Sequence, residues 1–382
     1  LSLLTFYHKS GEVLRTVTFG PNREAIITDI QYNHRGLPET VSNPYFEGET
    51  VHSTKYEYDR LERLATITTP DETSTNIIHQ GLITRTSISD GNGNEQKTKR
   101  TDNVMGWMVS NRDPQEVTVN YDYYADGSLA YTQIGSNAAS RIVIGYDNRG
   151  NRNSLTDPDY GTSSFVFDAY GNLKQRTSPN ADIFSYQYDP MGRLIEKQDS
   201  SENTTTTFVY DETEGLKGTL KSITHGDNQS IQYDYDRWLR LVSVGEQLFG
   251  TIYKTQLDYD DASRIHQITY PTGVTVQNGY SAYGHLNTIS DVDGNPLWEA
   301  NQTNAMGQLL QSTMGGQIVT NRLFDSKMHY IKGIATSNNL QNLSYGYDKF
   351  GNLARRTDSL RMMTETFQYD RLNRLTEIYF GD

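Results

Sequence analysis

Residues 188–194 read Tyr188-Asp189-Pro190-Met191-Gly192-Arg193-Leu194, and this seven-residue motif recurs along the chain. It follows Phe184-Ser185-Tyr186-Gln187, where aromatic and polar residues alternate with period two, a pattern that predicts a β-strand. The aspartate can accept hydrogen bonds from backbone N–H groups two or three residues further on, which predicts a turn. The glycine allows a positive φ without steric cost, and the leucine opens a second strand. The motif therefore predicts one β-hairpin.

The motif repeats at intervals of 21 to 25 residues over essentially the whole sequence. About 17 copies are expected, because weaker versions fill the gaps between the good ones. One copy carries four extra residues between its tyrosine and its glycine, and an insertion confined to this position indicates a solvent-facing turn. The copies are expected at Tyr7, Tyr32, Tyr58, His79, Thr101, Tyr123, Tyr146, Phe167, Tyr188, Tyr210, Tyr235, Tyr259, Tyr280, Thr303, Phe324, Tyr347 and Tyr369.

The residues expected to shape the repeats are the aromatic residue, the aspartate and the glycine of the best copies. A second turn, such as Asp157-Pro158-Asp159-Tyr160-Gly161, is expected to connect each hairpin to the next. The glycine position instead holds Glu62, Leu239, Ser263 or Asn373 in four copies, so either those turns change type or the position is less strict. The predicted structural residues are Tyr146, Asp147, Gly150, Phe167, Asp168, Gly171, Tyr188, Asp189, Gly192, Tyr235, Asp236, Tyr347, Asp348, Gly351, Tyr369 and Asp370.

The composition fits an all-β chain of many short strands. Only 35% of the 382 residues are hydrophobic, yet 27 Tyr, 12 Phe and 31 Gly distinguish the chain from a disordered one. A net charge of −13 disfavours nucleic acid as a partner. No apolar run approaches the length of about 18 residues that would predict a membrane span. The absence of cysteine excludes disulfides, thiolate zinc sites and cysteine nucleophiles.

No pattern in the sequence predicts catalysis, so the chain is expected not to be an enzyme and to hold no cofactor or metal. Paired carboxylates such as Asp157 and Asp159, or Asp260 and Asp261, are interpreted as turn caps. The eight histidines never adopt the HExxH spacing of zinc enzymes. The segments beginning at Asp90 and Asp291 start like calcium loops but lack a glutamate at the twelfth position, which favours turns. Arginines after the glycine position are expected to pair with neighbouring aspartates, or alternatively with an enclosed acidic segment: Arg63, Arg193, Arg240, Arg264 and Arg374.

The motif resembles the tyrosine–aspartate (YD) repeat of Rhs proteins. The copies Tyr188–Leu194 and Phe167–Leu173 look like that repeat, and Asp90-Gly91-Asn92-Gly93-Asn94 and Asp291–Pro296 resemble its second turn. The segment Asn43–Glu49 is similar to segments in the B/C subunits of insecticidal Tc toxin complexes. The resemblance covers nearly all of the chain.

This resemblance implies an all-β fold of tandem hairpins of about 22 residues, forming a long antiparallel strip that spirals into part of a hollow shell. About 34 strands spaced by about 4.8 Å give a strip on the order of 160 Å long, enough for roughly one turn of such a shell. Residues 1–382 are then expected to be a single repeat array, a fragment of a larger shell with no catalytic or toxin domain.

The function implied by the resemblance is that of a structural wall enclosing a C-terminal effector segment of an Rhs/Tc-type toxin. The expected partners are the remaining repeats and terminal regions of the parent protein, the enclosed toxin segment and toxin-complex subunits. The expected location is secreted or at the bacterial cell surface. The alternative is an adhesion or carbohydrate-binding surface, as in the teneurins, which carry a similar shell.

Overall fold

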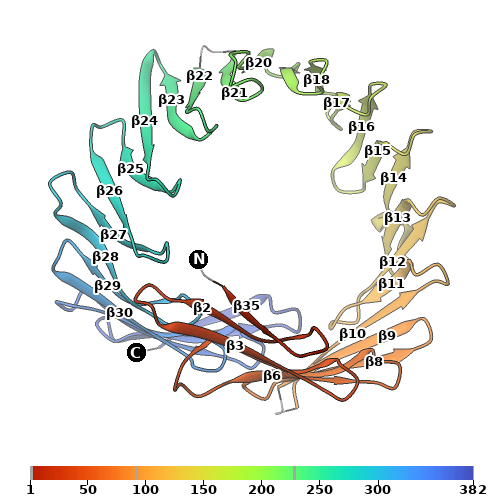
Figure 1. The fold of residues 1–382 in the computed structure, drawn as a ribbon. Coiled ribbons are helices and arrows are strands. Elements are labelled where there is room, and N and C mark those ends of the chain that lie inside the picture. Colours follow the sequence, from red (N-terminus) through yellow and green to blue (C-terminus); the bar gives the residue numbers. More distant parts are fainter. Residues whose placement is uncertain (1–2, 91–92, 227–228, 382) are drawn as a thin grey trace. The chain divides into compact units, whose positions relative to one another are not determined.

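The structure is a computed structural model that describes residues 3–90, 93–226 and 229–381. Within these residues the chain forms 35 β-strands, and its one helical element is the 3-10 turn η1 (Ala138–Ser140). The strands form antiparallel ladders with their neighbours along the chain (Figure 1). The predicted all-β fold of tandem antiparallel hairpins is confirmed. The number of strands also agrees with the expected 34, since β5 (Tyr45–Phe46) has only two residues.

The chain divides into two compact units. Unit 1 comprises residues 1–106, 111–117 and 278–382, and unit 2 comprises residues 107–110 and 118–277. Two of the four boundaries between the units fall inside strands, namely β11 (Met108–Arg112) and β26 (Thr275–Tyr280), and the other two lie on either side of β11. Each unit is built from the same kind of hairpin.

Unit 1 contains two runs of hairpins that are far apart in the sequence. In each run, strands pair with their neighbours along the chain, and β3 additionally pairs with the short β5. The first run consists of β1 (Leu4–Tyr7), β2 (Val13–Phe19), β3 (Ala25–Tyr32), β4 (Pro38–Ser42), β5, β6 (Ser53–Tyr58), β7 (Leu64–Thr68), β8 (Ser74–Gln80), β9 (Ile83–Ser89) and β10 (Glu95–Asp102). The second consists of β27 (Leu286–Ser290), β28 (Pro296–Thr303), β29 (Leu309–Met314), β30 (Ile318–Phe324), β31 (Ile331–Thr336), β32 (Gln341–Tyr347), β33 (Leu353–Asp358), β34 (Met363–Tyr369) and β35 (Leu375–Gly381).

Unit 2 is one uninterrupted run in which each strand pairs with the next. Its strands are β12 (Thr118–Tyr123), β13 (Leu129–Ile134), β14 (Ile142–Tyr146), β15 (Arg152–Asp157), β16 (Gly161–Phe167), β17 (Leu173–Thr177), β18 (Ile183–Tyr188), β19 (Leu194–Asp199), β20 (Thr204–Tyr210), β21 (Leu220–His225), β22 (Gln229–Tyr235), β23 (Leu241–Leu248), β24 (Thr251–Tyr259) and β25 (Ile265–Thr269).

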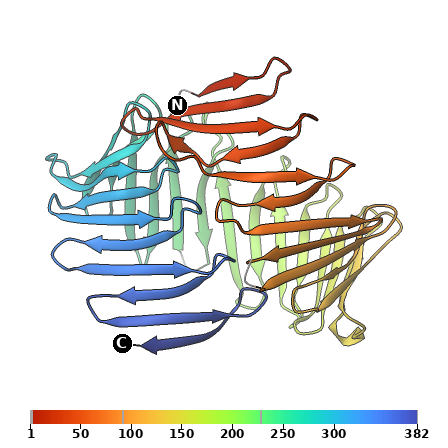
Figure 2. The same ribbon diagram turned by 90° about the horizontal axis from the view of Figure 1, so that it is seen from below.

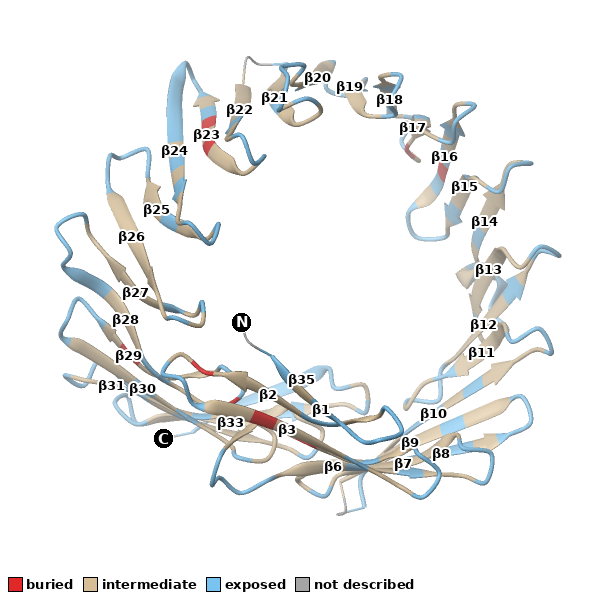
Figure 3. Ribbon diagram, in the orientation of Figure 1, coloured by how far each residue is buried: buried red, intermediate tan, exposed pale blue. Residues whose placement is uncertain are grey.

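The hairpins form a thin layer with almost no deeply buried side chains. Among the described residues, only Ile27 and Ala305 are buried hydrophobic residues, and no large side chain is less than 2% exposed. Most strand residues are half-buried, as the tan colouring of Figure 3 shows. Stability must therefore come from the backbone ladders and from contacts between adjacent hairpins. Cross-strand threonine pairs are one such contact, with Oγ1 atoms 2.9 Å apart at both Thr156–Thr162 and Thr269–Thr275.

The turns keep one backbone conformation even where glycine is replaced. Glu62, Leu239, Ser263 and Asn373 have φ values of 63°, 63°, 61° and 59°. Of the two alternatives left open by the sequence, a change of turn type is therefore excluded. The fold tolerates non-glycine residues in the left-handed region, although that region costs an L-residue roughly 1–2 kcal/mol.

Leu239 offers a direct test of that cost. Replacing Leu239 by glycine is expected to raise the free energy of unfolding by about 0.5–1 kcal/mol, because relief of the strain exceeds the entropy that glycine adds to the unfolded chain. Urea denaturation followed by circular dichroism would measure the change. The control is Trp238→Gly, at a neighbouring residue that lies outside the positive-φ region and is 60% exposed. A gain of stability in the control as well would contradict the explanation.

Candidate functional site at the repeat turns

Most repeat turns are three-residue loops closed by two backbone hydrogen bonds, and the turns at Asp211 and Asp325 are longer. In the best copy, Asp189 N–H donates to Arg193 O at 2.9 Å, and Gly192 N–H donates to Asp189 O at 2.9 Å. The strand register shifts by one residue just before Tyr188, which then pairs with Leu194. A type I turn followed by a residue in the left-handed region and a bulge produces this pattern.

The aspartate carboxylate organises the turn from inside. One oxygen of Asp189 accepts hydrogen bonds from the backbone N–H groups of Met191 and Arg193, both at 2.9 Å. This oxygen thus accepts from the residues two and four positions further on, whereas the motif predicted acceptance from residues two or three positions further on. The fourth residue is reached because the chain doubles back at the left-handed Gly192, which brings the N–H group of Arg193 over the carboxylate.

The second carboxylate oxygen pairs with the side chain four residues later. The arginines after the glycine position bind the aspartate of their own turn, as expected, with N–O distances of 2.6 or 2.7 Å at Asp59–Arg63, Asp189–Arg193, Asp236–Arg240, Asp260–Arg264 and Asp370–Arg374. In other copies an asparagine amide takes this place, at Asp147–Asn151, Asp168–Asn172, Asp291–Asn295 and Asp348–Asn352.

The sequence-predicted residues all lie at these turns, one set per hairpin. The aromatic residues Tyr146, Phe167, Tyr188, Tyr235, Tyr347 and Tyr369 each end a strand. The aspartates Asp147, Asp168, Asp189, Asp236, Asp348 and Asp370 each accept a backbone hydrogen bond two residues further on. The glycines Gly150, Gly171, Gly192 and Gly351 have φ values between 77° and 89°.

Several copies reach the same geometry with other residues. Asn304 accepts hydrogen bonds from Met306 and Gln308, so an amide oxygen replaces the carboxylate. The copy expected at Thr101 is displaced by one residue, because Asn103 supplies the capping oxygen to Met105 N–H and the strand continues to Asp102. Residues 91 and 92 of the turn that begins at Asp90 lie outside the described residues.

The tyrosine of the motif bonds to the hairpin that precedes it. The hydroxyl of Tyr188 donates to Leu173 O at 3.0 Å, and Tyr210, Tyr259 and Tyr369 donate likewise to Leu194, Leu241 and Leu353. These hydroxyls are therefore paired with backbone carbonyls, and burial raises the pKa of Tyr188. At His79, which occupies the tyrosine position, the ring nitrogen Nε2 lies 3.2 Å from Leu64 O and keeps the contact.

The hydroxyl contact carries a measurable part of the stability between hairpins. Tyr188→Phe is expected to lower the free energy of unfolding by about 1 kcal/mol, because it leaves the half-buried carbonyl of Leu173 without its donor. Urea denaturation would measure the loss. The matched control is Tyr170→Phe, at a ring that is 91% exposed, and it should leave stability unchanged. Equal losses in the two variants would argue against the role given to the hydroxyl.

The arginine of a turn also covers the tyrosine of the following hairpin. The Arg193 guanidinium lies 4.3 Å from the ring centroid of Tyr210, and that of Arg240 lies 4.4 Å from the ring of Tyr259. Aspartate, arginine and the next tyrosine thus form a chain of contacts that runs from hairpin to hairpin.

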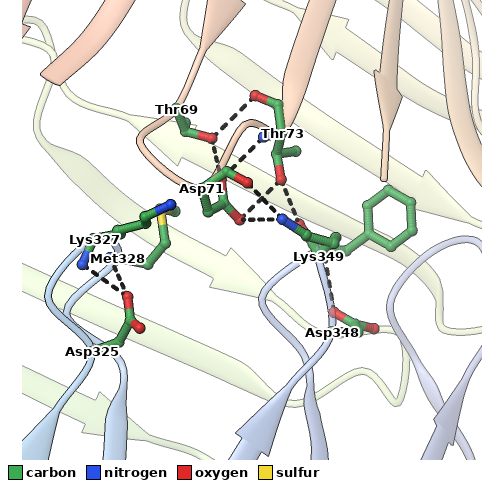
Figure 4. A network of polar contacts seen from close by, with 9 residues as sticks. Thr69, Asp71, Thr73, Asp325, Lys327, Met328, Asp348 and Lys349 are labelled. Carbon is green, nitrogen blue, oxygen red and sulfur yellow. Dashed lines mark hydrogen bonds and ion pairs between the residues drawn. The ribbon is translucent and has the colours of Figure 1, made fainter. Parts of the chain in front are cut away.

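In unit 1, the connecting turns of the first run meet the repeat turns of the second run (Figure 2). The Lys349 ammonium donates to Asp71 O at 2.5 Å, and Thr73 Oγ1 donates to Lys349 O at 3.4 Å (Figure 4). The residues that join at these contacts are separated by 276 to 278 positions in the sequence.

Further contacts in unit 1 also join turns or strand ends that are far apart in the sequence. The ring of Phe19 stacks on Tyr283 at 5.3 Å, and the Asn43 amide donates to Lys327 O at 2.8 Å. Gln115 makes a two-point contact with an aspartate–arginine pair: its amide nitrogen donates to Asp370 at 2.8 Å, and its oxygen accepts from Arg374 at 3.1 Å. No sequence signal identified these pairings, because the partners lie more than 250 residues apart in the chain.

The described residues hold no group of three or more histidine, aspartate or glutamate side chains that could bind a metal ion. They also contain no helix long and apolar enough to cross a membrane. The turns and the contacts between them are thus the recurring chemical feature of the chain, and they define a repeat protein built of tandem β-hairpins.

Comparison with known proteins gives one match to a family model and several matches to solved structures. The RHS Repeat family model matches residues 167–204, which span the motif copies at Phe167 and Tyr188. A crystal structure of TcdB2-TccC3 superimposes on 98% of the chain with a TM-score of 0.84 and 17% identity, and a structure of TcdB2-TccC3 without its hypervariable C-terminal region gives the same three values. The Photorhabdus luminescens Tc holotoxin pore matches 99% of the chain at a TM-score of 0.80 and 16% identity. Residues 167–204 thus match an RHS repeat, and the chain has the fold of these Tc toxin structures.

The chain spans about a quarter of the length of the solved chains that it matches, at 23% to 25%. No curated protein sequence matches it. The structural likeness therefore extends over the whole of this chain and over a limited part of its larger relatives.

Proposed function

We propose that this chain is part of the structural wall of an Rhs/Tc-type toxin and that the wall encloses a C-terminal effector segment. The observation that carries the proposal is the match of 98% of the chain to TcdB2-TccC3, a protein that has a hypervariable C-terminal region. The repeat turns support the proposal, because their tyrosine and arginine side chains contact the adjacent hairpins and so stabilise the layer.

The proposed mechanism is steric. A wall of this kind separates its contents from the surroundings by its backbone ladders and turn contacts. This mechanism needs no catalytic role for any residue of the chain. The proposed partners are the remaining repeats and terminal regions of the parent protein, the enclosed segment and the subunits of a toxin complex. The proposed location is outside the bacterial cytoplasm, secreted or at the cell surface.

Electron cryomicroscopy of the intact parent protein tests the proposal. The expected result is a closed wall formed by the hairpins, with additional density inside it. The matched control is a parent protein truncated before its effector segment, in which the wall should persist and the internal density should disappear. Hairpins that form an open surface, with no enclosed density in either sample, would overturn encapsulation and favour the adhesion alternative.

A further inference from the structure

A cavity between the two runs of hairpins in unit 1 contains two histidines. It has a volume of about 690 Å³ and is lined by residues between 43 and 52 of the first run and between 304 and 329 of the second. His52 lines it from the segment before β6, and His329 lines it from the turn between β30 and β31. His329 is half-buried. Because both rings face one cavity, a proton on one ring disfavours a proton on the other.

The ring of His329 joins the two runs by accepting a hydrogen bond. Its Nε2 atom lies 3.2 Å from the side-chain amide nitrogen of Asn43, which lies between β4 and β5. The same amide nitrogen donates to Lys327 O at 2.8 Å, and this contact fixes the orientation of the amide because a carbonyl oxygen can only accept. The other amide hydrogen then points at Nε2. The contact therefore requires a neutral imidazole whose Nε2 carries no proton.

The charged groups around the ring come from both runs. They are Asp325 in the turn of His329 itself, and Glu49 and His52 of the first run. The Asp325 carboxylate caps its own turn and lies 3.9 Å from the Lys332 ammonium, and the Glu49 carboxylate accepts from a backbone N–H of its own turn. Burial lowers the pKa of His329 and outweighs the opposing effect of Asp325, while His52 lowers this pKa further and Glu49 raises it. The surroundings thus favour the neutral ring.

A second histidine between the same two runs has the opposite bonding. Nε2 of His285 lies 2.9 Å from Phe19 O, so this ring donates its hydrogen bond. A protonated imidazole carries N–H groups at both nitrogens, and the His285 contact is therefore compatible with protonation. The His329 contact is not, because protonation would set two donors against each other.

We propose that His329 is a pH-sensitive latch between the two runs of unit 1. At neutral pH the ring accepts the hydrogen bond of Asn43 and holds the runs together. In mildly acidic surroundings Nε2 becomes a donor that faces another donor, protonated His52 repels the ring, and the latch opens with uptake of a proton. The inference goes beyond the proposed function, because it holds for this chain whether or not the chain encloses a segment.

The pH range of the latch differs from that of the repeat turns. The pKa of His329 is lower in the folded state, so the contact is fully stable above the unfolded pKa of about 6.5. Its stability falls as the pH drops below that value toward the folded pKa, because the opened state binds the proton more tightly. The turn aspartates lose their contribution only near pH 4 and below. A comparison of about pH 7.5 with about pH 5 therefore separates the two effects.

Hydrogen–deuterium exchange of the intact parent protein at these two pH values, followed by mass spectrometry and corrected for the intrinsic exchange rate, tests the proposal. Peptides that cover residues 43–52 and 325–331 are expected to lose about tenfold in protection at the lower pH, because opening takes up one proton. His329→Gln replaces Nε2 by an amide oxygen that accepts at either pH, so the loss should disappear. The matched control, His285→Gln, alters the other histidine between the two runs and should keep the tenfold loss.

Asn43→Asp is a second test, which remains informative if His329→Gln fails to fold. A carboxylate at position 43 attracts the protonated ring, so protection of residues 325–331 should rise on acidification instead of falling. Equal protection of the unaltered protein at the two pH values would overturn the inference. A tenfold loss that persists in His329→Gln or in Asn43→Asp would overturn it as well.

Discussion

Replacing Gly127 by alanine is expected to lower the free energy of unfolding by about 3 kcal/mol, through backbone strain of roughly 1–2 kcal/mol and overpacking of similar size. Gly127 has a φ of 90°, and a Cβ added there would lie 2.8 Å from Cζ2 of the Trp107 ring. That ring packs against Tyr123 with a centroid distance of 5.3 Å, so it cannot withdraw without losing its own contacts. Denaturation by urea, followed by circular dichroism, would measure the loss.

Gly171→Ala is the matched control for this prediction. Gly171 occupies the same turn position with a φ of 89°, and a Cβ there would meet nothing within 4 Å. The control should therefore lose only the strain component, about 1–2 kcal/mol. Because the backbone angles agree, the difference between the two variants isolates the contact with Trp107. If both variants lost the same amount, packing of the repeat turn on the preceding hairpin would contribute nothing.

Acidification is expected to destabilise the whole array. Hydrogen bonds at the turn lower the pKa values of many aspartates: the Asn151 amide is the largest cause at Asp147, the Asn172 amide at Asp168, and the Arg264 backbone N–H at Asp260. A carboxyl whose pKa is lower in the folded state stabilises the fold at pH values above its unfolded pKa. This stability is lost as the pH falls through the folded pKa, so the loss should begin near pH 4 and grow below it. Because the turn recurs in most hairpins, the separate losses accumulate, and thermal unfolding between pH 7 and pH 3 would reveal the decrease in Tm.

The chain itself supplies a non-titrating control for the acid effect. At one turn the aspartate is naturally replaced by Asn304, whose amide donates to Gln308 at 2.8 Å while its oxygen accepts the two backbone hydrogen bonds. The double substitution D147N/N151Q copies this pair, and D168N/N172Q copies it at the next hairpin. With both double substitutions in place, Tm should depend less steeply on pH below 4 than in the parent chain. An unchanged slope would show that these turns do not cause the acid sensitivity.

The sequence alone determined the local structure of this protein, because most repeat turns are encoded within five consecutive residues. An aspartate followed by a left-handed residue three positions later is sufficient to close the loop, and the alternating residues before it are sufficient to form the strand. The same locality explains why the pairing of Asp189 with Arg193 could be expected: both residues belong to one turn. The tyrosine hydroxyl contact repeats along the chain, and the leucine near the start of the preceding return strand was the signal that could have revealed it.

Only the tertiary structure decided which turns meet. Nothing in the sequence around Asp71 or Lys349 distinguishes these residues from the corresponding residues of other repeats. The Lys349 ammonium nevertheless donates to the backbone carbonyl of Asp71, 278 positions away. The same holds for the residue two positions after the start of a repeat turn: Tyr283 is covered by Phe19, whereas Tyr170 occupies the equivalent position and is 91% exposed. Contacts of this kind depend on small rotations between successive hairpins that accumulate over many repeats. A local code sets the conformation of each hairpin, but the sum of many such rotations determines which distant turns lie side by side.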